Sequence, residues 1–118
     1  YKQNELIFKM GDESDEIYFI KKGNVKIVLS LADGMSYHLV TISKGSFFGD
    51  LAFLDKRKRS ANAMASDEVL LYILPRNKFD DIAVQYPDVA GKFFEKLAFI
   101  IANRLRQSDI ELKTLQDN

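Results

Sequence analysis

The stretch that decides both fold and chemistry runs from residue 45 to residue 61 and reads GSFFGDLAFLDKRKRSA. Within it, Gly49 precedes Asp50, Leu51 and Ala52, a sequence that can open a single helical turn. The first turn of a helix has backbone N–H groups without intrahelical partners, and its aligned peptide dipoles make this end positive. The sequence therefore predicts a place near Gly49 where an anion can bind.

Two side chains further along the same stretch add to this prediction. Arg59 lies ten residues after Gly49, and the hydroxyl of Ser60 follows it. A guanidinium is a rigid fork of donors that suits a phosphate, and a serine adds one more donor. An ionised Asp50 can only accept, so it can bind a sugar hydroxyl or orient Arg59 when no ligand is present. Together these groups predict a ligand that is a phosphorylated sugar.

Outside this stretch, turn signals recur about every ten residues through the first two thirds of the chain, which is typical of an antiparallel all-β domain. The runs between them are rich in β-branched and aromatic residues, and Val25, Ile27, Leu29 and Leu31 alternate with other residues as in a half-buried strand. The predicted strands are 6–8, 16–20, 25–31, 37–42, 61–65 and 69–74. Counting short pieces, we expect about eight strands in a barrel or jelly-roll.

After Pro75 the pattern becomes helical. We expect a short helix over 76–83 with Phe79 and Ile82 facing inward, and a long helix that begins at Pro87. Apolar residues recur in the long helix at three- and four-residue steps: Ala90, Phe94, Leu97, Ile101, Leu105, Leu112 and Leu115. We expect residues 93–105 to cover the sheet and residues 105–115 to form a dimer or inter-domain contact. One domain then divides into a β-roll region over 1–85 and a helical region over 86–118.

Composition excludes several classes of function. Seventeen basic and seventeen acidic residues give no net charge, which excludes a generic electrostatic nucleic-acid binder. There is no cysteine, and His38 is the single histidine, so zinc, thiolate and histidine-built metal sites are excluded and we expect no metal. The basic run 56–59 is interpreted as a solvated loop with Arg59 turned inward. No nucleophile–base pair stands out, so we expect a binding module that is not an enzyme.

The ends of the chain predict a part of something longer. It begins at Tyr1 with no apolar signal segment, and its longest late apolar run, 97–102, is far shorter than the roughly 20 residues of a spanning helix. We expect a cytoplasmic domain, free or as the cytosolic part of a membrane protein.

The sequence resembles the cyclic-nucleotide-binding domain family, which catabolite activator proteins, cyclic-nucleotide-dependent kinase regulatory regions and cyclic-nucleotide-gated channels share. The resemblance covers essentially the whole chain through spaced glycines and a two-part cassette, which is formed here by residues 45–52 and 59–61. Its motifs are NELIF (4–8), GD (11–12), DEIYFI (15–20), GNV (23–25), DG (33–34), GSFFGDLA (45–52), RSA (59–61) and LPRNKF (74–79). The family implies an antiparallel β-roll with a short helix in the phosphate-binding cassette and flanking terminal helices.

The resemblance also implies roles for individual residues. Arg59 would pair with the cyclic phosphate of cAMP or cGMP, and Asp50 stands where the family usually has a Glu that binds the ribose 2′-hydroxyl. The phosphate would also meet Ser60 and backbone N–H groups near Leu51, Ala52 and Ala61, while Ile27 and Val40 would lie against the purine. The C-terminal helix would cover the base and report occupancy. No cofactor is implied.

Two interpretations remain open at this point. Asp50 is one methylene shorter than Glu, which predicts weaker ribose binding, so the chain is either a cyclic-nucleotide sensor or a degenerate β-roll for protein interaction or dimerisation. Either way we expect an attached effector outside these residues, a transcription regulator or a transporter, and no direct nucleic-acid binding by this domain. The runs DGMSYHL (33–39) and RLR (104–106) resemble domains at the C-termini of bacterial sulfate-permease-type transporters.

Overall fold

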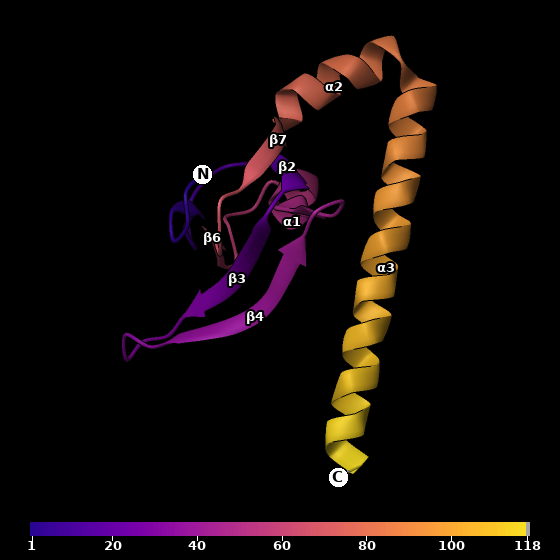
Figure 1. The fold of residues 1–118 in the computed structure, drawn as a ribbon. Helices are drawn as coiled ribbons and strands as arrows, with labels where there is room; N and C mark the ends of the chain where they lie inside the picture. Colours follow the sequence, from indigo (N-terminus) through magenta and orange to yellow (C-terminus); the bar gives the residue numbers. More distant parts are fainter. Residues whose placement is uncertain (118) are drawn as a thin grey trace. The chain divides into compact units, whose positions relative to one another are not determined.

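The computed structural model describes the backbone of residues 1–117 and the side chains of residues 1–108. Within that part of the chain there are seven β-strands and three α-helices (Figure 1). The strands are β1 (Leu6–Phe8), β2 (Ile17–Lys22), β3 (Asn24–Ser30), β4 (Ser36–Ser43), β5 (Phe47–Phe48), β6 (Asn62–Ala65) and β7 (Leu70–Leu74). The helices are α1 (Asp50–Asp55), α2 (Arg76–Gln85) and α3 (Pro87–Asp117). The predicted class, a β-rich fold with a short helix and a long C-terminal helix, is confirmed with seven strands where about eight were expected.

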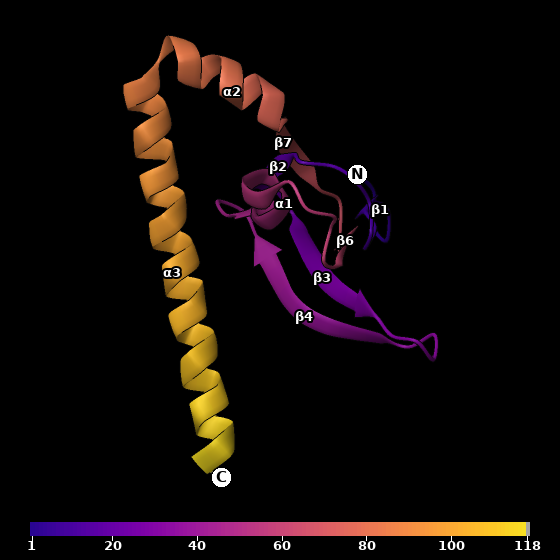
Figure 2. The ribbon, with the colours of Figure 1, turned by 180° about the vertical axis from the view of Figure 1, so that it is seen from behind.

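The strands form two antiparallel sheets. One has the order β1-β6-β3-β4 and the other the order β5-β2-β7. β3 and β4 make the long hairpin that Figures 1 and 2 show, and its turn holds Gly34 at a φ of 82°. The register shifts between Ile27↔Val40 and Val28↔His38, which leaves Leu39 as the extra residue of a β-bulge.

The core lies between the two sheets and takes residues from both. Its buried members are Phe8, Tyr18, Ile20, Val25, Phe48, Ala63, Ala65 and Val69, with Ile27 packed against them. The rings of Tyr18 and Phe48 stack with centroids 4.9 Å apart. Of the alternating series predicted for one strand, Val25 is fully buried, whereas Leu31 lies beyond the end of β3 and is 46% exposed. Packing of these apolar faces fixes β2, which α1 contacts, and β6, which begins directly after residue 61.

The chain divides into two compact units, Tyr1–Lys78 and the residues from Phe79 onward, which we describe separately. In the second unit, Phe79 of α2 packs on Phe93 and Phe94 of α3 at centroid distances of 5.1 and 4.9 Å. Pro87 is the first residue of α3, as predicted. The prediction for Ile82 is wrong: Phe79 is 3% exposed but Ile82 is 40% exposed, because the phenylalanine rings occupy the contact between these helices.

Several predictions concern α3. Ala90 and Leu97 are buried as the apolar repeat indicates, whereas Leu105 is 61% exposed. Leu112 and Leu115 lie outside the residues whose side chains the structure describes. The covering of the sheet by residues 93–105 and the division at residue 85 stay predictions. None of the described helices has both the length and the apolar character needed to cross a membrane.

Candidate functional site

The predicted helical turn is present as α1, which begins at Asp50 and lies against β2. Gly49 precedes it with a φ of 78°, in the left-handed region that disfavours side chains. A Cβ at this position would lie 2.9 Å from Arg59 Nη1, 2.9 Å from the Glu16 carbonyl oxygen and 3.0 Å from the Tyr18 ring. Both the backbone angle and the close packing therefore require glycine here.

Arg59 is the only charged residue buried in the described part of the chain, at 4% exposure. Its Nη1 donates to the Gly49 carbonyl (2.9 Å), its Nη2 to the Glu16 carbonyl (2.7 Å) and its Nε to the Ser14 hydroxyl (2.9 Å). The guanidinium also lies 4.2 Å from the centroid of the Phe8 ring, a cation–π contact. Burial lowers the pKa of Arg59 from its ordinary value, although an arginine stays protonated.

The backbone of Arg59 is tied to the loop before β2 as well. The N–H of Gly11 donates to the Arg59 carbonyl (2.8 Å), and the Arg59 N–H donates to the Asp12 carbonyl (3.0 Å). Backbone and side chain together fix Arg59 to the segment 11–16 and to the residue that opens α1. Arg59 therefore links the loop before β2 to the start of α1.

The ion pair between Asp50 and Arg59, which would mark a filled and degenerate cassette, is not among the contacts of Arg59 in the described residues. Asp50 is the half-buried first residue of α1, where a negative charge is stabilised by the helix dipole. Of the two roles predicted for Asp50, orienting Arg59 is therefore filled by other groups.

The remaining predicted site residues fall into two groups. Ala52 and Ala61 are buried at 4% and 5% exposure, while Ser60 is exposed and Leu51 is 56% exposed. Ile27 and Val40 are cross-strand partners on β3 and β4; Ile27 packs on the core and Val40 is 48% exposed. The structure brings Gly49 to Arg59 and Ile27 to Val40, each pair in direct proximity.

Sequence reasoning missed the residues that hold Arg59. Phe8, Ser14 and Glu16 all belong to the N-terminal part of the chain, and the hydrogen bonds from Arg59 to Ser14 and Glu16 span 45 and 43 positions. The Glu16 side chain accepts from the Tyr18 hydroxyl at 2.8 Å, which adds a further link beside the guanidinium. A backbone carbonyl has no residue-type signal, so only the serine hydroxyl could have been suspected from the sequence.

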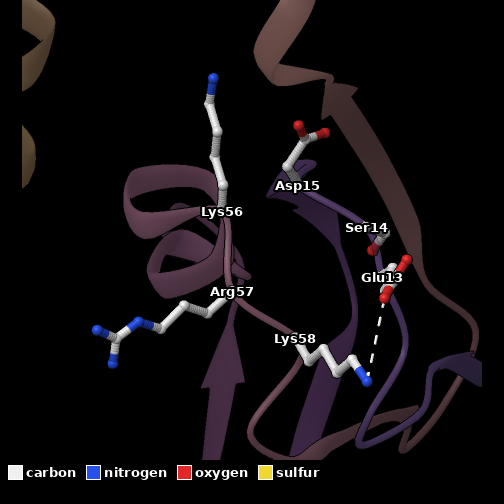
Figure 3. Close-up of a pocket in the computed structure, with 6 residues that line it drawn as sticks. All are labelled: Glu13, Ser14, Asp15, Lys56, Arg57 and Lys58. Carbon is white, nitrogen blue, oxygen red and sulfur yellow. Dashed lines mark ion pairs between the residues drawn. The ribbon is translucent and has the colours of Figure 1, made fainter.

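An open hollow of about 850 Å³ lies beside the cassette, between two loops of opposite charge (Figure 3). Glu13, Ser14 and Asp15 line one side and the exposed cations of 56–58 the other. Figure 3 shows Lys58 reaching toward Glu13, with a Nζ–Oε1 distance of 4.0 Å. Both side chains are mostly exposed, so this ion pair contributes little to stability. The basic run is a solvated loop with Arg59 turned inward, as predicted.

Chemically, this arrangement holds a buried cation against two backbone carbonyls, one before β2 and one at the start of α1. Arginine has five N–H donors, of which three donate to Ser14, Gly49 and Glu16. The guanidinium is kept in a fixed orientation by its partners, and its charge is desolvated. Charge-assisted hydrogen bonds are strongest under those conditions.

Comparison with known proteins shows which family the chain resembles. A family model described as the cyclic nucleotide-binding domain matches residues 1–86. The cyclic AMP receptor protein of Thermus thermophilus is 32% identical over 115 residues, which are 98% of this chain and 51% of that protein. The crystal structure of the catabolite activator protein of Thermus thermophilus superposes with a TM-score of 0.80 at 32% identity, over 98% of this chain and 53% of that one.

A cyclic nucleotide-binding domain from Methylobacillus flagellatus superposes with a TM-score of 0.85 at 20% identity, over 91% of this chain and 60% of that one, which shows the shared fold. The chain spans about half the length of the Thermus receptor protein.

Proposed function

Because this chain belongs to the cyclic nucleotide-binding domain family, we propose that it binds a cyclic nucleotide, cAMP or cGMP, and relays occupancy to an attached effector. The observation that carries the proposal is the buried Arg59 at the opening of α1. A guanidinium removed from water is expensive unless its donors are used, and a cyclic phosphate would engage those that its protein partners leave.

In this proposal the remaining site residues surround the rest of the ligand. Ser60 and the backbone N–H groups near Leu51, Ala52 and Ala61 complete the phosphate contacts. Asp50 accepts from the ribose 2′-hydroxyl, and Ile27 and Val40 lie against the purine. The exposure of Leu51 and Ser60 supports this, because a ligand needs accessible groups to contact.

The C-terminal helix is the element we propose as the relay. α3 runs from Pro87 to Asp117, far longer than its contact with α2 at Phe93 and Phe94 requires. A ligand that binds one arrangement of this helix better than another shifts the population toward it. The effector, a transcription regulator or a transporter, would lie outside these residues and on the cytoplasmic side. The link to sulfate-permease-type transporters stays a prediction.

A thermal melt with and without nucleotide tests the proposal. A ligand that binds only the folded state adds about 2.7 kcal/mol to the free energy of unfolding at a hundredfold excess over Kd. The melting temperature rises as a result. We expect a rise with cAMP or cGMP in the wild-type chain and none in Arg59→Lys, which keeps the charge but lacks the planar fork. Lys58→Ala, on the exposed neighbouring residue, should keep the response. A wild-type chain without any shift at millimolar ligand would refute nucleotide binding.

A second candidate is an interaction module that binds no nucleotide, and one observation favours it. The guanidinium of Arg59 already has three protein acceptors, so the cassette keeps its shape without an anion. In that case α3 would mediate dimerisation through its exposed apolar residues, such as Phe99 (69% exposed) and Leu105. Sedimentation of wild-type chain against Leu105→Glu tests this: self-association that the variant abolishes, without any nucleotide response, selects the second candidate.

A further inference from the structure

Ser14 supplies a side-chain acceptor to Arg59, whereas the acceptors of the two terminal nitrogens are backbone carbonyls. It accepts from Nε at 2.9 Å, over 45 positions of sequence. Substitution can therefore remove this acceptor, whereas the carbonyls of Gly49 and Glu16 persist whatever the side chain. Ser14 is half-buried and also lines the hollow beside the cassette (Figure 3).

The hydrogen bond to Ser14 comes from Nε, and it therefore restrains the orientation of the guanidinium plane. The group is planar, so fixing Nε as well as a terminal nitrogen fixes both the tilt of the plane and its rotation about the side chain. Ser14 and Glu16 hold Nε and Nη2 from one loop, while Gly49 holds Nη1 from the start of α1. Without Ser14, the guanidinium plane could rotate about the line that joins its two terminal nitrogens. It would then tilt relative to the Phe8 ring over which it lies.

We propose that Ser14 is a positioning residue that sets the plane of the Arg59 guanidinium, and so aims its remaining donors at a phosphate. The effect on ligand affinity rests on the proposed function, whereas the effect on the guanidinium does not. Loss of one hydrogen bond to a charged group corresponds to roughly a tenfold loss of affinity or more. We expect Ser14→Ala to weaken nucleotide binding about tenfold.

NMR of the ¹⁵N-labelled chain without nucleotide tests the positioning directly. The Nε–H signal of Arg59, assigned by its absence in Arg59→Lys, should exchange slowly with solvent because the group is buried and bonded. Ser14→Thr and Ser14→Val have nearly the same shape and differ in the hydroxyl, so they form a matched pair even where Ser14→Ala is poorly folded. Ser36→Ala, at an exposed serine of β4, is the control.

Slow exchange of this signal in wild type, Ser14→Thr and Ser36→Ala, with fast exchange in Ser14→Val, is the expected result. An Nε–H that stays protected at its wild-type shift in Ser14→Val would overturn the proposal. Titration of the same variants with cAMP and cGMP then measures affinity. A wild-type chain that binds neither would refute the proposed function alone, while equal affinity of the Thr and Val variants would refute the link between Ser14 and binding.

Discussion

Arg59 has a structural task and, in our proposal, a binding task. Its hydrogen bonds to Ser14, Gly49 and Glu16 close the loop before β2 onto the start of α1, and its stacking on Phe8 joins both to the core. The proposed phosphate contact uses donors that these bonds leave. Substitution of Arg59 therefore lowers stability as well as affinity, and binding data on such variants need a melting curve beside them.

Asp50 is the residue where the chain departs from the family's usual glutamate. Its carboxylate lies about 1.5 Å closer to the backbone than that of a glutamate. A charged hydrogen bond contributes roughly 1.5–3 kcal/mol, so we predict that Asp50→Glu tightens nucleotide binding about tenfold to a hundredfold. Calorimetric titration of the variant checks this. Asp55→Glu, the same change at the other end of α1, should leave affinity unchanged; weaker binding by Asp50→Glu would show that the backbone already compensates for the shorter acid.

Tyr18 predicts a pH dependence. Burial, followed by the hydrogen bond to Glu16, raises the pKa of Tyr18 well above its ordinary value of 10.0. The folded state therefore holds the phenolic proton more tightly than the unfolded chain does. The resulting stability is fully present below about pH 10 and is lost as the pH rises above it.

Urea unfolding between about pH 8 and pH 11 measures this dependence. We expect the midpoint to fall at the alkaline end in wild type and to fall less steeply in Tyr18→Phe. Some slope should remain, because burial also raises the pKa of Tyr1. An unchanged slope in Tyr18→Phe would contradict the assignment.

At the scale of elements, α1 ends in a strained residue. Lys56 closes the helix with its N–H bonded to the Ala52 carbonyl at 2.8 Å, and its φ of 58° lies in the left-handed region. Glycine adopts that conformation without the strain of a Cβ, so we predict that Lys56→Gly stabilises the chain by roughly 0.5–1 kcal/mol. Lys56→Ala keeps a Cβ and should gain nothing. A lower melting temperature for Lys56→Gly than for Lys56→Ala would contradict the explanation.

Two glycines in turns between consecutive strands separate strain from steric overlap. Gly23 and Gly34 have φ values of 91° and 82°, but a Cβ at Gly23 would overlap the Glu68 carbonyl oxygen, whereas a Cβ at Gly34 meets nothing within 4 Å. We predict that Gly34→Ala costs about 1–2 kcal/mol and Gly23→Ala at least about 2 kcal/mol more. Denaturant titration of both variants checks the difference. Equal losses would mean that the turn between β2 and β3 shifts freely.

The elements show what the sequence could and could not predict. Gly49, Asp50 and Arg59 are close along the chain, and local rules were enough to place the short helix and the inward arginine. The sequence does not predict β5 as a separate strand, because two residues are too few to show an alternating pattern. The sequence predicts that Ile82 faces inward together with Phe79, yet the rings of Phe93 and Phe94 decide which face of α2 is covered. Two of the three acceptors of Arg59, Ser14 and Glu16, lie more than forty positions away, and no local pattern predicts contacts over that separation.

At the scale of the whole molecule, a chain without net charge can still bind an anion. A net charge of zero excludes a partner that is held by overall electrostatic attraction. One desolvated arginine with a fixed set of backbone groups, however, needs no excess of basic residues in order to bind an anion. The two compact units divide the tasks in our proposal, with binding assigned to residues 1–78 and relay to α3. The family model matches residues 1–86, and the effector stays part of the proposal.

The most direct measurement of the central claim is isothermal titration calorimetry of the chain with cAMP and cGMP, repeated with adenosine and guanosine. The nucleosides keep the sugar and the base but lack the phosphate that Arg59 is proposed to bind. We predict saturable heat at one ligand per chain for at least one cyclic nucleotide, and affinity at least about a hundredfold lower for its nucleoside. No heat with either nucleotide at millimolar concentration, or equal affinity for nucleotide and nucleoside, would contradict the account.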